Sequence, residues 1–147
     1  MKSVDCNHVM LLNSFNNLAD EFFEKMTKSF PQEGKIRGYH AAFRTARKYN
    51  NKKPVEMFMT NLIPFGYQII HKEESFFKKD EYVDHVQSLS GKMGLLQYWE
   101  TMPKQSQIAI WEYMQSLYML GMNIFGLQED LKKIMNAKKD NTVYDSK

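Results

Sequence analysis

The densest group of residues that could do chemistry is a run of cations from Lys35 to Lys53. Seven Lys or Arg side chains fall within these nineteen residues, and no Asp or Glu does. At about 100° per residue, one helix face would carry five polar or basic residues: Arg37, His40, Arg44, Arg47 and Lys48. The opposite face would carry apolar residues for the core: Tyr39, Ala42, Phe43, Ala46 and Tyr49. We expect a cationic stripe on an amphipathic helix, and we take its five residues as the candidate partner-binding site.

The stripe fits several kinds of partner. It could bind an acidic protein surface, nucleic-acid phosphates or anionic lipid headgroups, because Arg and Lys meet each at little geometric cost. It could also be only a solvated face, or be neutralised by the acidic stretches at 73–74 and 80–84. The net charge of +3 does not by itself favour nucleic acid. We therefore predict a non-catalytic interaction protein that binds an acidic protein surface, with nucleic-acid binding through the same helix as the alternative.

No catalytic or metal-binding pattern accompanies the stripe. The four histidines and the lone Cys6 share no paired spacing on a helix face, so we expect no metal site. The segment Gly91-x-x-Gly94 lacks both the length and the Lys of a phosphate-binding loop, and no G-x-S-x-G nucleophile motif occurs. Paired carboxylates such as Glu129-Asp130 lie in charge-mixed segments that we expect to be exposed, which does not favour a catalytic pair. We predict no enzyme, no cofactor and no small-molecule substrate.

The elements that must position these residues are predicted to be helices. Apolar spacings of three and four recur along the chain, and no stretch shows the alternation of a strand. The first predicted helix runs over 9–29 and ends before Pro31. The second, which carries the stripe, lies between Gly34 and Asn50. The third begins at Pro54, which suits a first helical turn.

Prolines and glycines mark the later elements. Pro64 falls inside the apolar pattern of the third helix and predicts a kink. A short element at 74–79 precedes a fourth helix at 82–96, which two glycines weaken. The last long helix has Thr101 as its candidate N-cap, with Pro103 in its first turn.

The chain should form one domain. We expect the last long helix to end at Gly126 and a short helix to follow at 127–136. The predicted organisation is a flexible N-terminus at 1–8, a helical bundle domain at 9–136 and a disordered polar tail at 137–147. The predicted fold class is an all-α, single-domain bundle of about five principal helices plus short helices.

Composition agrees with a globular domain of 147 residues, because 43% are hydrophobic and 14% aromatic. The apolar runs are far shorter than the roughly 20 residues of a membrane-spanning helix, so no membrane span is predicted. A single cysteine and the lack of a secretory signal pattern favour an intracellular protein. Eleven methionines should mostly fill the core, although a groove rich in Met and aromatic residues is a second surface that could hold a partner.

Several short motifs carry a resemblance. They are Phe15-Asn16, Phe30-Pro31, Tyr67-x-x-Ile70-x-Lys72-Glu73-Glu74-x-Phe76-Phe77 with Asp80 and Tyr82, Trp99, and Ile110-Trp111-x-Tyr113-Met114-Gln115-x-Leu117. Their layout resembles that of short all-helical proteins of unassigned function from large nucleocytoplasmic DNA viruses, the giant viruses. The resemblance covers about residues 15–118 and carries over no catalytic residues. It implies a virion or capsid-associated component, or an accessory protein of the viral factory in the host cell.

Overall fold

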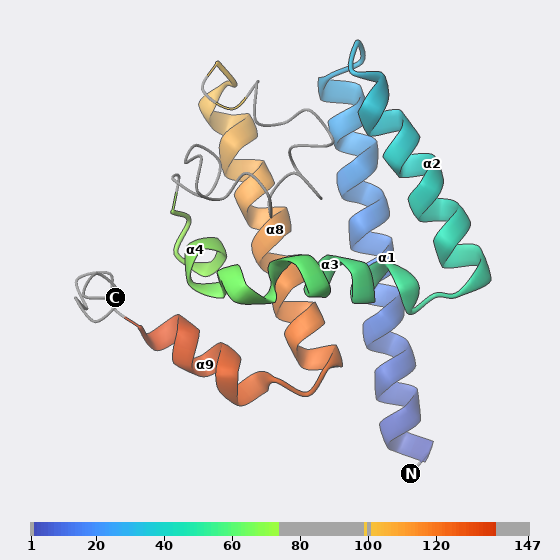
Figure 1. Cartoon of the computed structure of the whole chain (residues 1–147), viewed down its shortest axis with the longest axis vertical. Helices are drawn as coiled ribbons and strands as arrows, with labels where there is room; N and C mark the ends of the chain where they lie inside the picture. Colours follow the sequence, from blue (N-terminus) through green and yellow to red (C-terminus); the bar gives the residue numbers. More distant parts are fainter. Residues whose placement is uncertain (1, 74–98, 100, 138–147) are drawn as a thin grey trace.

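The computed structural model describes residues 2–73, 99 and 101–137, and these contain helices and no strand (Figure 1). The helices are α1 (Lys2–Ser29), α2 (Gly34–Tyr49), α3 (Lys53–Leu62), the 3-10 turn η1 (Ile63–Phe65), α4 (Gly66–Ile70), α8 (Lys104–Ile124) and α9 (Gln128–Asn136). The predicted all-α fold is confirmed. The elements predicted at 74–79 and 82–96, and the polar tail from residue 138 on, lie outside the described residues.

The first helix is longer than predicted. α1 begins at Lys2 and not at Val9, so residues 2–8, predicted as a flexible terminus, are helical. The prediction placed the start where the apolar stripe begins. No proline or glycine occurs at positions 2–8, so nothing in this segment breaks the helix. At 28 residues α1 is about 42 Å long.

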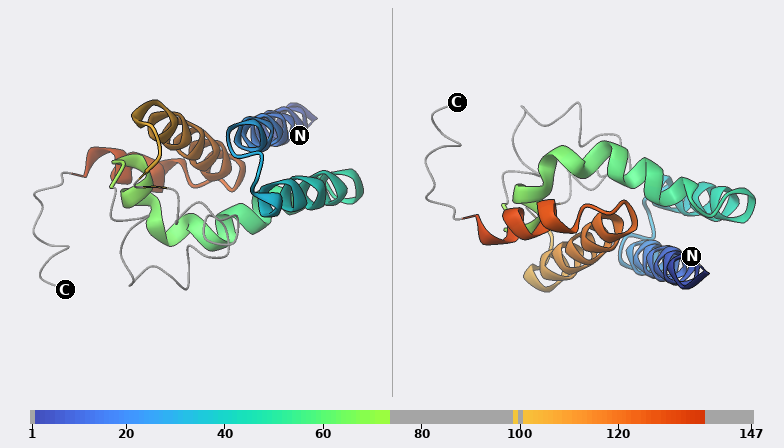
Figure 2. Two further views of the ribbon diagram at one scale, coloured as in Figure 1. Left: turned by 90° about the horizontal axis from the view of Figure 1, so that it is seen from above. Right: turned by 90° about the horizontal axis from the view of Figure 1, so that it is seen from below.

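One hydrophobic core joins the described helices. α1 packs against both α8 and α2, and α3 crosses in front of α1 and α8 (Figure 1). The views from above and below show α3 on one side of the α1 and α8 pair (Figure 2). Aromatic rings fill the contacts: Phe15 meets Phe58 of α3 edge to face at 5.5 Å, and Phe22 lies 5.1 Å from Tyr113 of α8 between ring centroids. Burial of these rings supplies much of the driving force for folding.

Two glycines allow α3 and α4 to lie close to α8. A Cβ added at Gly121 of α8 would lie 2.3 Å from the sulfur of Met59 in α3. A Cβ added at Gly66 of α4 would lie 2.3 Å from the hydroxyl oxygen of Tyr118. A side chain at either position would require Met59 or Tyr118 to move, so these two side chains occupy the space that each glycine leaves open.

Pro64 interrupts the third helix as predicted. α3 ends at Leu62, the 3-10 turn contains Pro64, and α4 then continues the helical path. The Tyr118 hydroxyl donates a hydrogen bond of 3.1 Å to the Ile63 carbonyl at this break. Burial raises the pKa of Tyr118 to about 12, so the hydroxyl keeps its proton at neutral pH.

The two ends of α8 differ in how well they were predicted. The predicted N-cap at Thr101 is wrong: the N-cap is Pro103, whose φ of −57° and ψ of 146° place it outside the helix. N-cap preferences favour side chains with an oxygen that accepts a backbone hydrogen bond, so they do not predict a proline at the N-cap. At the other end, Gly126 adopts a φ of +74°, and Leu127 N–H donates to the Met122 carbonyl at 2.7 Å. This geometry is a Schellman motif and confirms the end predicted at Gly126.

No helix among the described residues is both long and apolar enough to cross a membrane.

Candidate functional site

The side of α2 that enters the core differs from the prediction. Ile36 is fully buried and Phe43 nearly so, whereas Tyr39 is 37% and Tyr49 is 80% exposed. The predicted apolar face is therefore only partly a core face. Ile36 and Phe43 are seven residues apart and share a stripe with His40, so burying them turns the predicted cationic stripe toward α1. The prediction assigned Tyr39 and Tyr49 to the core because they are large and partly apolar, and this placed the core face on the wrong side of the helix.

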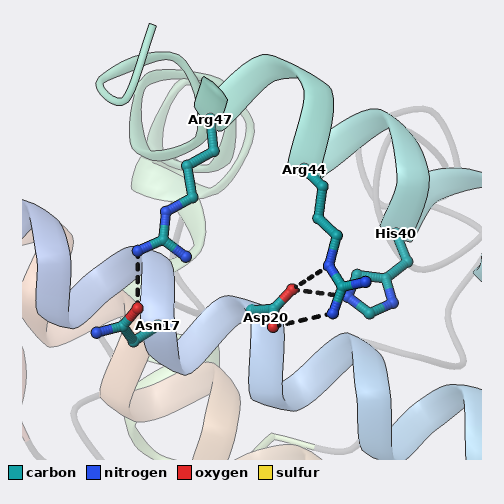
Figure 3. A network of polar contacts seen from close by, with 5 residues as sticks. All are labelled: Asn17, Asp20, His40, Arg44 and Arg47. Atoms are coloured by element: carbon teal, nitrogen blue, oxygen red, sulfur yellow. Dashed lines mark hydrogen bonds and ion pairs between the residues drawn. The ribbon is translucent and has the colours of Figure 1, made fainter. Parts of the chain in front are cut away.

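A polar cluster, formed by Asn17 and Asp20 of α1 with His40, Arg44 and Arg47 of α2, joins the two helices (Figure 3). Arg44 holds both carboxylate oxygens of Asp20, from Nε to Oδ1 at 2.8 Å and from Nη2 to Oδ2 at 3.2 Å. His40 Nε2 lies 2.8 Å from the same Oδ1. Arg47 Nη2 donates to Asn17 Oδ1 at 2.7 Å. Three of the five predicted site residues are thus bound to α1.

The electrostatics of the cluster favour an ionised Asp20. The hydrogen bond from Arg44 is the largest cause and lowers the pKa of Asp20 to about 2, partial burial opposes it, and the hydrogen bond with His40 adds to it. In return Asp20 raises the pKa of Arg44. The carboxylate offsets positive charge on the stripe, which weakens the attraction of this part of α2 for an outside anion.

The remaining two predicted residues lie at the margin of the cluster. Arg37 donates to the Pro31 carbonyl and stays exposed. Lys48 is exposed and forms no ion pair with any described residue. The structure therefore separates the stripe into a cluster of three residues that contact α1 and two exposed cations.

Asp20 and Asn17 were missed by the sequence reasoning, which sought the acidic counterpart at 73–74 and 80–84. A signal for them was present, because Asn17 and Asp20 are three residues apart and share one polar face of the first helix. Nothing in the sequence paired that face with the second helix. The turn between Phe30 and Glu33 does so by reversing the chain.

An apolar groove lies on the other flank of α2, between α2 and α3. Its α2 wall is formed by Tyr39, Ala42, Phe43 and Ala46, and its α3 wall by Pro54, Met57, Phe58 and Asn61. Phe15, Ala19, Phe22 and Phe23 of α1 and Leu117 of α8 form its floor. The cavity volume is about 190 Å³. We call this feature the α2–α3 groove.

The groove is preformed and open to solvent. Met57 is 54% exposed and Tyr39 is 37% exposed, so the two walls present apolar surface. Asn61 donates its amide to the Met57 carbonyl at 2.8 Å, which bonds this polar side chain within its own helix. Asn16 is buried and donates to the Asn51 carbonyl at 2.9 Å, which holds the turn between the walls against α1.

A second hollow of about 180 Å³ lies between α1 and α8. At its edge the Tyr113 hydroxyl donates to Glu21 at 2.5 Å, and Lys25 lies 5.7 Å from the centre of the Tyr113 ring. Burial raises the pKa of Tyr113. Lys25 also lies 4.0 Å from the Glu21 carboxylate, so the three groups contact one another.

The described residues contain no group of three or more His, Cys, Asp or Glu side chains that could hold a metal ion. The groove therefore offers apolar contact area, and the α1–α2 cluster offers structural stability.

Comparisons of the chain with family models, with curated proteins and with solved structures find no significant match. The resemblance to short helical proteins of giant viruses accordingly stays a prediction.

Proposed function

We propose that this chain is a non-catalytic interaction protein that holds a protein partner in the α2–α3 groove. The observation that carries the proposal is the exposed apolar lining of a preformed groove, with Met57 and Tyr39 open to water on facing walls. Contiguous exposed apolar surface is uncommon on a monomer and is typical of interaction sites. Methionine and aromatic side chains suit such a site because they adapt to a partner's shape.

The cationic stripe has a different part in this proposal from the one predicted. His40, Arg44 and Arg47 fix α2 to α1 and hold the groove wall in place. Arg37 and Lys48 stay exposed and attract acidic partners over a distance, which raises association rates more than affinity. A place in a virion or viral factory would agree with a binding role, and it rests on the resemblance alone.

Site-specific photo-crosslinking tests the proposal. A photoreactive phenylalanine replaces Tyr39 in the groove, and in a matched control it replaces Ala41, which is exposed on the other side of α2. We expect a discrete adduct from position 39 only, and mass spectrometry of the adduct identifies the partner. Introducing Ala42→Glu should remove the adduct by filling the groove. Equal adducts from both positions, or no adduct from position 39, would count against the groove.

Nucleic-acid binding by α2 is the second candidate, favoured by the two exposed cations Arg37 and Lys48. Asp20 works against it, because a fixed carboxylate lies within the stripe. Titration with a single-stranded DNA of about 20 nucleotides at increasing salt separates the two functions. A steep fall of affinity with salt, lost in Arg37→Glu/Lys48→Glu, would favour nucleic acid through counterion release.

A further inference from the structure

The charge around the α2–α3 groove is strongly one-sided. Residues 33–62, which include both walls, the N-cap of α2 and the turn between the walls, hold seven Lys or Arg and two acids, Glu33 and Glu56, so their net charge is 7 − 2 = +5. Two of these cations, Arg44 and Arg47, contact α1 and not the groove. Lys35 falls on the same helical stripe as Tyr39, Ala42 and Ala46, at intervals of four, three and four. Lys53 begins α3 directly before the lining residue Pro54.

Neither acid is a lining residue of the groove. Glu33 is the N-cap of α2, and its carboxylate accepts a hydrogen bond from Lys35 N–H. Glu56 is two residues before Phe58, so about 200° of helical rotation places it on the other side of α3 from the groove. It is also exposed. An occupant would therefore meet apolar side chains in the groove and positive charge at the ends of its walls.

The length of the lining matches a short stretch of helix. From Tyr39 to Ala46 the α2 wall spans seven residues, about 10 Å or two helical turns. Apolar residues at i, i+4 and i+7 of a partner helix cover the same length, which is the usual spacing of helix-in-groove recognition. The described residues offer no strand edge to which an extended peptide could add.

Resting on the proposed function, we infer that the groove takes an acidic amphipathic helix from the partner. Its apolar stripe lies on the aromatic floor, and its Glu or Asp residues face Lys35 and Lys53. Charge complementarity then selects the partner and its orientation, while the apolar contacts supply the affinity.

Three labelled peptides of about 16 residues test the inference by fluorescence anisotropy at low salt. The first is Ala-based and helical, with Leu at i, i+4 and i+7 and Glu on both flanks. The second has Lys in place of Glu. The third keeps the Glu and Leu residues but carries two central prolines, which break the helix. We expect the first to bind about tenfold tighter than either of the others.

Variants of the protein locate the binding. Ala42→Glu should abolish binding of the acidic helix, because the new side chain fills the groove. Lys35→Glu/Lys53→Glu should weaken the acidic helix by about tenfold and favour the Lys peptide, because the charge at the ends of the walls is reversed. Lys104→Glu, an exposed charge at the start of α8, is the matched control and should change nothing. Circular dichroism checks that each variant is folded.

The outcomes separate the inference from the proposed function. Equal or tighter binding of the Lys peptide overturns the acidic partner, and equal binding of the proline peptide overturns the helix. In both cases, if Ala42→Glu still blocks binding of the peptide, the groove remains a binding site. Binding of no peptide overturns the inference, and an adduct at position 39 would still support the groove. A dimer in sedimentation that Ala42→Glu dissociates would identify a second copy as the occupant and overturn the inference.

Discussion

The two flanks of α2 are built in opposite ways. The flank toward α1 combines the buried Ile36 with the polar side chains His40 and Arg44, which bind Asp20. The flank toward α3 carries Tyr39, Ala42 and Ala46 along an open groove. Polar and apolar residues of this helix thus both hold it against α1, while other apolar residues of the helix face solvent. The difference shows that charge on a helix does not by itself mark the surface that meets a partner.

The largest effect should come from the α1 flank. Ile36→Ala removes a fully buried side chain and should lower the free energy of unfolding by about 3 kcal/mol, through lost burial and the cavity left behind. Urea denaturation followed by circular dichroism measures it. The matched change on the other flank, Tyr39→Ala, should cost less than about 1 kcal/mol because Tyr39 is partly exposed. Equal costs would contradict the contrast between the flanks.

The next effect concerns the ion pair. Asp20→Asn removes the carboxylate that binds Arg44 and should cost about 1 kcal/mol at neutral pH, a value reduced by the 56% exposure of Arg44. The folded-state pKa of about 2 is below the ordinary value of 3.8. This stabilisation is therefore complete above about pH 4 and is lost as the pH falls from 4 to 2.

Measuring unfolding free energies at pH 7 and at pH 2.5 tests this sign. The difference between the native chain and Asp20→Asn should shrink at the lower pH. Glu129→Gln, at a side chain that is 84% exposed, is the control and should stay within about 0.5 kcal/mol of the native chain at pH 7. A difference that grows on acidification would show that Asp20 is not held ionised by Arg44.

The smallest effect on stability belongs to the groove flank. Ala42→Glu places a good helix former at an exposed position and should change the free energy of unfolding by less than about 0.5 kcal/mol. The same variant should lose the crosslink from position 39. A variant that is stable but no longer binds would sharpen the contrast, whereas one that unfolds would contradict it.

Local signals in the sequence were enough for the all-α class, the interruption at Pro64 and the helix end at Gly126. The class depends on apolar periodicity, and the other two depend on backbone geometry within a few residues, because proline fixes φ and glycine permits the positive φ of a helix end. The start of α1 was missed because only the apolar stripe was followed, and residues 2–8 continue the helix without it.

The orientation of α2 could not be read from its own sequence. Two faces of this helix carry apolar residues, and the choice between them depends on which one meets α1 and α3. That choice is made by the burial of Ile36 and by the polar contacts of Asp20 and Asn17, which span 20 and 30 residues of chain. Local periodicity contains no information on such pairings.

The close approach of α3 and α4 to α8 has a consequence for which glycines homologous chains can replace. A methyl group at position 66 or 121 would overlap Tyr118 or Met59 unless that side chain moved. At Gly38, by contrast, an added Cβ meets no atom within 4 Å. Homologous chains that share this fold should therefore keep glycine at 66 and 121 through long divergence and vary freely at 38. That pattern of retained and replaced glycines would identify a distant relative where overall identity has decayed.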